Sequence, residues 1–234
     1  GRVGGRCRPG VRQENGGHNS RSGLHQYIIM GPQGSGKGTQ ARRLAADLGI
    51  VPISMGEILR WHMANNTPIG ERIRHHMESG QLVPDDVVQQ VITDRLKEPD
   101  VAKGYILDGF PRTPGQAEFF LTHHRIKAAI LLEVSEETLR KRILGRRLCD
   151  ACGKDFNVYF RPPKVEEVCD VCGGKLSART DDTPEGIRQR LSDYKTKTEP
   201  VVGMLRQKGF VITVPAESHP DQVHEQILKA IGGR

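Results

Sequence analysis

The sequence has few aromatic residues and no long apolar run. Phe, Trp and Tyr make up only 5% of its 234 residues, which disfavours an aromatic-rich sandwich or a surface built to stack nucleic-acid bases. The longest apolar run, Ala128–Leu132, has five residues, whereas a helix that spans a membrane needs about 20. A chain of this length can bury about 70% of its unfolded surface. We therefore expect a folded protein without a membrane span.

Acidic residues are scarce in the first 26 positions. This stretch holds five Arg and one acid, a charge of +4, so the other 208 residues carry only +3 of the formal +7. Its richness in Gly, Arg, Asn and Ser and its lack of periodicity predict a disordered extension over residues 1–26. We interpret it as a dispensable extension and expect a cytoplasmic protein. The alternative is that this stretch is an organelle transit peptide. Basic residues later in the chain are spaced, which suits small anionic ligands at least as well as nucleic acid.

Cysteine is scarce too, but it is clustered. Four of the five cysteines form two Cys-x-x-Cys pairs: Cys149/Cys152 and Cys169/Cys172. Their spacing, with Gly153 and Gly173 after each pair, is typical of a tetrahedral zinc site made of two knuckles. Four thiolates leave no open position, so we expect a structural Zn²⁺ that stabilises an insertion too small to form its own core. Two disulfides or an iron site are the alternatives, and Cys7 is left over.

Short apolar runs recur along the rest of the chain. They are Tyr27–Met30, Ile50–Ile53, Tyr105–Leu107, Ala129–Val134 and Phe210–Val214. Their length and continuity indicate strands buried on both faces. Helical periodicity lies between them, over 41–48, over 87–96 after Pro84-Asp85, and from Ile187 after the capping pair Thr183-Pro184. This alternation predicts an α/β protein with a parallel sheet covered by helices on both faces.

A glycine-rich segment connects the first predicted strand to the first predicted helix. It reads Gly31-Pro32-Gln33-Gly34-Ser35-Gly36-Lys37-Gly38-Thr39, and its position between strand and helix is the one a phosphate-binding loop requires. Glycines let backbone N–H groups face phosphate oxygens, and the helix start adds partial positive charge. Lys37 can reach the β and γ phosphates, and Thr39 can place its hydroxyl on Mg²⁺.

From this loop onward the sequence resembles the adenylate kinase family in its long-lid form. Six ordered blocks carry the resemblance: Gly31–Gln40, Ile53–Arg60, Gly80–Asp85, Asp108–Thr113 with Gln116, Gly145–Arg147, and Arg179–Asp182 with Arg190. The resemblance implies a P-loop three-layer core formed by residues 27–53, 84–147 and 179–234. It also implies a helical nucleoside-monophosphate-binding insertion at 54–83, here called the acceptor segment, and a zinc-knuckle lid at 148–178.

The resemblance implies reversible transfer of a phosphoryl group from MgATP to AMP, which gives two ADP. ATP, AMP and ADP would then be the partners of a monomeric enzyme that binds no nucleic acid and no membrane. Two alternatives stay open within enzymes, GTP as the donor or another nucleoside monophosphate as the acceptor. From another class, a basic chain with four paired cysteines could be a nucleic-acid-binding zinc protein, although its lid lacks a dense Lys/Arg run.

The resemblance also assigns roles to single residues. The donor nucleotide would be bound by Gly34, Ser35, Gly36, Lys37, Gly38, Thr39, Arg142 and Arg146. The AMP site would include Ser54, Arg60, Val83, Gly109, Arg112 and Gln116. Arg179 and Arg190 would span the phosphates of donor and acceptor, and Asp108, at the end of a buried strand, would hold Mg²⁺ through water. Gln116 would read the adenine edge of AMP, because an amide donates and accepts together.

One departure from the family pattern bears on the acceptor. Met55 stands where many members have a small hydroxyl residue, which removes one expected hydrogen bond near the acceptor base.

Overall fold

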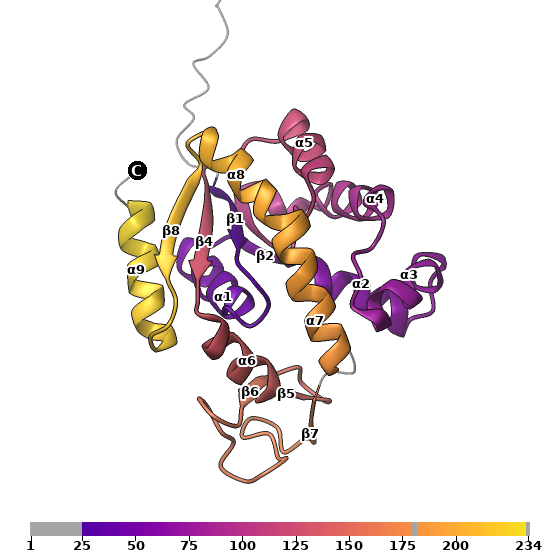
Figure 1. The fold of residues 1–234 in the computed structure, drawn as a ribbon, viewed down its shortest axis with the longest axis vertical. Helices are drawn as coiled ribbons and strands as arrows, with labels where there is room; N and C mark the ends of the chain where they lie inside the picture. Colours follow the sequence, from indigo (N-terminus) through magenta and orange to yellow (C-terminus); the bar gives the residue numbers. More distant parts are fainter. Residues whose placement is uncertain (1–24, 179–181, 233–234) are drawn as a thin grey trace, which may run out of the picture.

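Five parallel strands form the centre of the molecule in the computed structural model, which describes residues 25–178 and 182–232 (Figure 1). The strands are β1 (His25–Met30), β2 (Val51–Ser54), β3 (Gly104–Asp108), β4 (Ala128–Glu133) and β8 (Val211–Pro215), in the order β2-β3-β1-β4-β8. All five predicted strands are confirmed. The predicted disordered extension was residues 1–26, but its last two residues, His25 and Gln26, belong to strand β1, so that boundary is wrong. The rest of that prediction, over residues 1–24 with Cys7, and the prediction for Arg179 lie outside the described residues.

Helices cover both faces of this sheet. Alternate residues of β1 separate into two apolar clusters, with Tyr27 and Ile29 in one and Ile28 and Met30 in the other. The first cluster is completed by helices α1 (Lys37–Leu48) and α9 (Pro220–Gly232). The second is completed by α4 (Asp85–Arg95), α5 (Pro114–His123) and α8 (Glu199–Gln207). The predicted three-layer α/β core is therefore confirmed.

A long helical stretch crosses the front of the sheet in Figure 1. It starts as α7 (Pro184–Asp193), where Thr183 accepts the N–H of Gly186 as the N-cap and Pro184 takes the first turn, as the sequence predicted. It then widens into a π-helical turn at Tyr194–Thr198 and continues as α8. π-helical turns are rare and occur often at functional sites.

The acceptor segment contains two short helices that pack on each other, α2 (Met55–Ala64) and α3 (Pro68–Ser79). The approach is close, because a Cβ added at Gly70 would lie 2.0 Å from the carbonyl oxygen of His62. Gly80 ends α3 with a left-handed φ of 74°. A Cβ there would lie 2.9 Å from Cα of Gly186 in α7, so glycine lets the end of this segment rest on the core.

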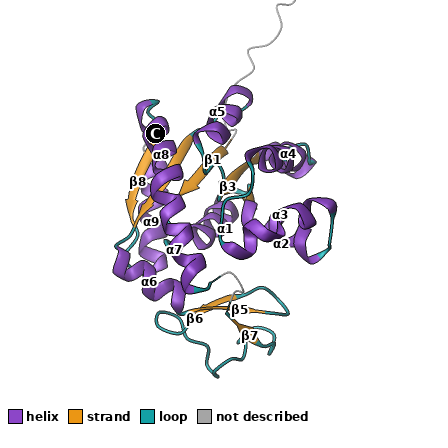
Figure 2. Cartoon of the chain, turned by 45° about the vertical axis from the view of Figure 1, so that its right-hand side comes forward, coloured by secondary structure: helices purple, strands orange, loops and turns teal. Residues whose placement is uncertain are grey.

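Helix α6 (Glu136–Leu144) leads from the core to the lid, which Figure 2 shows below the helices. Three short strands, β5 (Arg146–Cys149), β6 (Asp155–Asn157) and β7 (Leu176–Ser177), form an antiparallel sheet in the order β6-β5-β7. Its apolar cluster has only four buried members: Cys149, Phe156, Cys169 and Leu176. So small a core agrees with the expectation that the insertion depends on a metal.

Within the described residues, no helix combines the length and apolar character that crossing a bilayer would require.

Candidate active site

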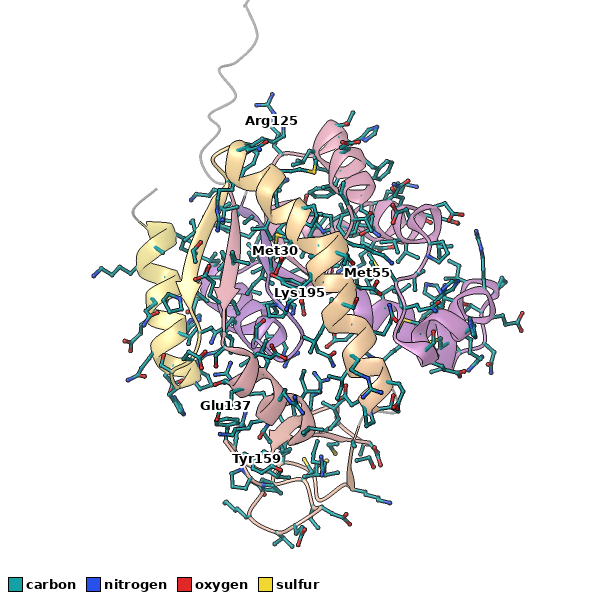
Figure 3. The ribbon with its side chains drawn as sticks, viewed as in Figure 1. Met30, Met55, Arg125, Glu137, Tyr159 and Lys195 are labelled. Atoms are coloured by element: carbon teal, nitrogen blue, oxygen red, sulfur yellow. The ribbon has the colours of Figure 1, made fainter. Side chains whose placement is uncertain are left out.

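One cavity of about 880 Å³ lies between the core, the acceptor segment and the lid. The last residues of β1, β2 and β3 line it, so it opens at the carboxyl edge of the sheet, where parallel α/β proteins bind ligands. In Figure 3, Met30 and Met55 mark the middle of the molecule, Tyr159 marks the lid, and Arg125 lies at the opposite end. Apart from the cysteines and Arg179, every site residue predicted from the sequence lines this cavity.

The phosphate loop has a backbone that only glycine allows. Gly31 has a φ of 145°, and a Cβ there would lie 2.7 Å from Oγ of Ser35 and 2.8 Å from the carbonyl oxygen of Leu132. Gly34, at a φ of 83°, would bring a Cβ within 2.8 Å of Ile143. Gly36 caps helix α1 in the left-handed conformation. The loop is therefore a tight turn that points the start of α1 into the cavity, as anion binding requires.

The side chain of Lys37 folds back over the phosphate loop. Its Nζ donates to the carbonyl oxygens of Gly31 and Pro32, both at 2.8 Å, so the ammonium is already held beside the turn. On the other side of the loop, Oδ2 of Asp108 lies 3.4 Å from the position a Cβ on Gly38 would take. Asp108 and Thr39 both line the cavity beside the start of α1, and oxygen ligands of this kind suit a nucleotide-bound Mg²⁺.

A buried carboxylate connects the arginines at the base of the lid. The Asp182 side chain is 5% exposed, and its oxygens accept from Arg146 at 2.7–2.9 Å, from Arg190 at 3.1 Å and from Gln33 at 2.9 Å. Arg146 begins β5, Arg190 belongs to α7, and Gln33 belongs to the phosphate loop. One acidic group therefore fixes two guanidinium groups from distant segments beside the phosphate loop.

Arg142, on α6, is held by carbonyl oxygens from far along the chain. It donates to Ala216 at 2.8 Å and to Glu217 at 3.3 Å, and its Cζ lies 5.7 Å from the ring centroid of Phe160 in the lid. Burial lowers the pKa of Arg142, but an arginine stays protonated in proteins. No sequence motif marks residues 216–219, the loop between β8 and α9 that also lines the cavity.

On the acceptor side, the loop after β3 is held by a bond between two of its own residues and by a bond from Thr198 of the π-helical turn. Nε of Arg112 donates to the carbonyl oxygen of Gly109 at 2.9 Å, and the Thr198 hydroxyl donates to the carbonyl oxygen of Arg112 at 2.9 Å. Thr198 is the last residue of the π-helical turn, so this turn places the Thr198 hydroxyl against the loop after β3. Met55 is 3% exposed, packs into the core and also lines the cavity. Where many family members have a small hydroxyl residue, this cavity therefore has an apolar wall.

Arg42 is a cavity residue that the sequence reasoning missed. From helix α1, its guanidinium lies 3.1 Å from Asp155 in the lid and 3.5 Å from Glu57 in the acceptor segment. One core cation thus contacts both insertions. Its position five residues after Lys37 could have suggested a place near the site, but its two partners lie in separate insertions and leave no local pattern.

The four paired cysteines come together at one point. Their sulfur atoms all lie within 4.8 Å of one another, with Cys149 and Cys172 at 3.4 Å and Cys152 and Cys169 at 3.7 Å. A tetrahedral zinc with bonds of about 2.3 Å separates its sulfurs by about 3.8 Å. Each of the four is a free thiol, so the structure contradicts the two-disulfide alternative.

The thiols of this cluster do not ionise independently. Backbone N–H groups of Cys152 and Ala151 lower the pKa of Cys149 to about 7. The Gly174 N–H lowers the pKa of Cys172, but bonds to the neighbouring thiols outweigh it and raise that pKa to about 12. The two values differ because the thiol that ionises first disfavours the second. A bound cation would stabilise the thiolates together, and the close approach of the four sulfur atoms fits a metal such as zinc.

A P-loop joined to a cationic cavity between two insertions defines a nucleoside monophosphate kinase. The family model of adenylate kinase matches residues 29–210. The adenylate kinase of Caldicellulosiruptor saccharolyticus is 40% identical over 88% of this chain and 99% of its own length. Those of Lachnospira eligens and Methanosarcina barkeri are each 42% identical, over 88% and 86% of this chain and 100% and 95% of their own lengths. The chain belongs to the adenylate kinase family.

Proposed function

We propose that this enzyme transfers the γ-phosphoryl group of MgATP to AMP and forms two ADP. The observation that carries the proposal is a shared cavity: Lys37 of the phosphate loop and Arg112 and Gln116 of the acceptor loop line the same space. A donor and an acceptor nucleotide can therefore lie with their phosphates facing each other. The names of the curated relatives support the same reaction.

The chain's residues would act by positioning and by charge. Transfer of a phosphoryl group spreads negative charge over the oxygens between donor and acceptor. Lys37, Arg142 and Arg146 would neutralise it on the donor side, and Arg60 and Arg112 on the acceptor side. Arg190 would reach both, and Arg179 is proposed for the same role from the sequence. Because the two phosphates can be held in line, no covalent enzyme intermediate is needed.

Mg²⁺ would enter with ATP and would polarise the phosphates when bound. Asp108 and Thr39 are the residues proposed to hold it, Asp108 through water because Mg²⁺ keeps much of its hydration shell. Zn²⁺ would serve the lid alone, since four thiolates leave no position for a substrate. Closing the lid and the acceptor segment over the cavity would exclude water and prevent hydrolysis of ATP.

We propose that the donor base lies against the loop 216–219, whose residues line the cavity. Product analysis with a matrix of ATP, GTP, AMP, GMP, CMP and UMP tests the assignment. We expect the highest kcat/KM for ATP with AMP. The proposed substrates would be wrong if the enzyme used a pyrimidine monophosphate as well as AMP or better, or used GTP as well as ATP or better. A monomeric state and a cytoplasmic location stay predictions.

A further inference from the structure

Two groups of fixed hydrogen-bonding character hold the Gln116 side chain. Its Oε1 accepts the backbone N–H of Arg112 at 2.8 Å, and its Nε2 donates to Oδ1 of Asp85 at 2.8 Å. Gln116 is 2% exposed and lines the cavity. A backbone N–H only donates and a carboxylate only accepts. Turning the amide by 180° would therefore break both bonds and bring like groups together.

Asp85 is held in turn by the start of the neighbouring helix. It begins α4, and its Oδ2 accepts from the Thr113 hydroxyl at 2.8 Å. The same hydroxyl accepts the N–H of Gln116 at 3.2 Å as the N-cap of α5. These bonds close a ring between the first turns of α4 and α5. The orientation of the Gln116 amide therefore depends on the position and charge of Asp85.

After these two bonds, the Gln116 amide has one N–H on Nε2 and one lone pair on Oε1 left for a ligand. A ligand must offer an acceptor to the first and a donor to the second. Adenine has this pair on one edge, with an amino group at C6 and an acceptor at N1. A 6-oxopurine has the reverse pair, an oxygen at C6 and an N–H at N1. The ribose fixes which way the base faces. A 6-oxopurine could therefore form both hydrogen bonds only if the Gln116 amide were turned by 180°.

We propose that Asp85 is the positioning residue that sets the choice of acceptor base. By fixing the orientation of the Gln116 amide, it selects a 6-aminopurine monophosphate over a 6-oxopurine monophosphate. The inference rests on the proposed function, because it takes the acceptor to be the nucleotide beside Gln116. Asp85 acts through Gln116 and does not need to touch the nucleotide.

The test compares kcat/KM for AMP and for inosine monophosphate, which differ only at C6 and N1. Asp85→Asn keeps the shape of the side chain but lets it donate, so the Gln116 amide loses its fixed orientation. We expect the AMP preference to fall about tenfold, the effect of one misplaced hydrogen bond. The change should lie mainly in KM. Asp86→Asn is the matched control, because it removes the same charge one residue along, from an exposed pair with Arg72 at 2.6 Å, and should leave the ratio unchanged.

A second pair of variants separates positioning from damage to the fold. Asp85→Ser should lower the AMP preference as well. In a Gln116→Leu background, Asp85→Asn should have no further effect on the ratio of kcat/KM for AMP to that for inosine monophosphate. An unchanged ratio in folded Asp85 variants, or an equal fall with and without Gln116, would overturn the inference alone. A wild-type enzyme that does not phosphorylate AMP would overturn the proposed function and the inference with it.

Discussion

Arg146 and Asp182 meet through three hydrogen bonds of 2.7–2.9 Å, in which Nε and Nη2 of the guanidinium donate to the two carboxylate oxygens. Arg146 lies just before the lid and Asp182 just after it. The pair therefore joins the two ends of the insertion at the edge of the cavity. Arg190 donates to the same carboxylate, so Asp182 fixes two of the cations proposed to hold phosphates.

Asp182→Asn should lower kcat/KM for ATP by roughly 10-fold to 100-fold, because a small displacement of an orienting group has effects of that size. The variant removes a buried negative charge that the guanidinium groups of both Arg146 and Arg190 contact. Steady-state kinetics in both directions measure the effect. Glu185→Gln is the control, since it breaks an exposed pair with Arg188 at 2.7 Å on the same helix. Equal activity of the two variants would show that Asp182 does not position the arginines.

Arg112→Lys should lower kcat/KM by about 100-fold or more, as loss of one preorganised donor to a developing charge does. Lysine keeps the charge but loses the planar fork that binds two phosphate oxygens. Lys37→Met should be at least as damaging. Kinetics on variants that circular dichroism finds folded check both. Near wild-type activity in either one would show that its residue is wrongly assigned.

The purified protein should contain about one zinc per chain. Cys149→Ser should lower the metal content sharply, while Cys7→Ser should leave it unchanged, because Cys7 is not one of the four clustered thiols. Metal removal should destabilise the lid, since zinc binds the folded state. Elemental analysis, with activity against temperature with and without chelator, measures both effects. A folded, metal-free enzyme that is inactive at every temperature would contradict a purely structural zinc.

Tyr105→Phe should make the protein more resistant to alkali. Burial raises the pKa of Tyr105 to about 12, whereas an unfolded tyrosine ionises near pH 10. Its contribution to stability is therefore complete below about pH 10 and is lost as the pH rises toward 12. Among the described residues the buried hydroxyl has no hydrogen-bond partner, so its removal should not weaken the fold at pH 7.

Urea unfolding at pH 7 and at about pH 11 measures the change, with Tyr159→Phe as the control because that ring is exposed in the lid. If wild type and Tyr105→Phe lose the same free energy of unfolding between the two pH values, Tyr105 does not limit alkaline stability.

The sequence predicted the core because its signals are local. Continuous apolar runs marked the buried strands, and the Thr183-Pro184 pair marked the start of α7. The strands of the lid were missed because they have two to four residues, too few for a periodic pattern. The π-helical turn was missed as well, because Tyr194 fits the apolar spacing of an ordinary helix.

The site was predictable where a motif names its residues, and less so where partners come from distant segments. Lys37 and Arg112 belong to dense motifs, and both line the cavity. The carbonyl groups that hold Arg142, the carboxylate that orients Gln116 and the two contacts of Arg42 are set by tertiary packing. No sequence spacing encodes them.

The transfer of phosphate from ATP to AMP is tested most directly by following the label from γ-labelled ATP. The purified enzyme is incubated with labelled MgATP and unlabelled AMP, and the nucleotides are separated. We expect the label to appear in the β-phosphate of ADP, with two ADP formed for each ATP consumed. Label in inorganic phosphate, or none transferred when AMP is present, would contradict it.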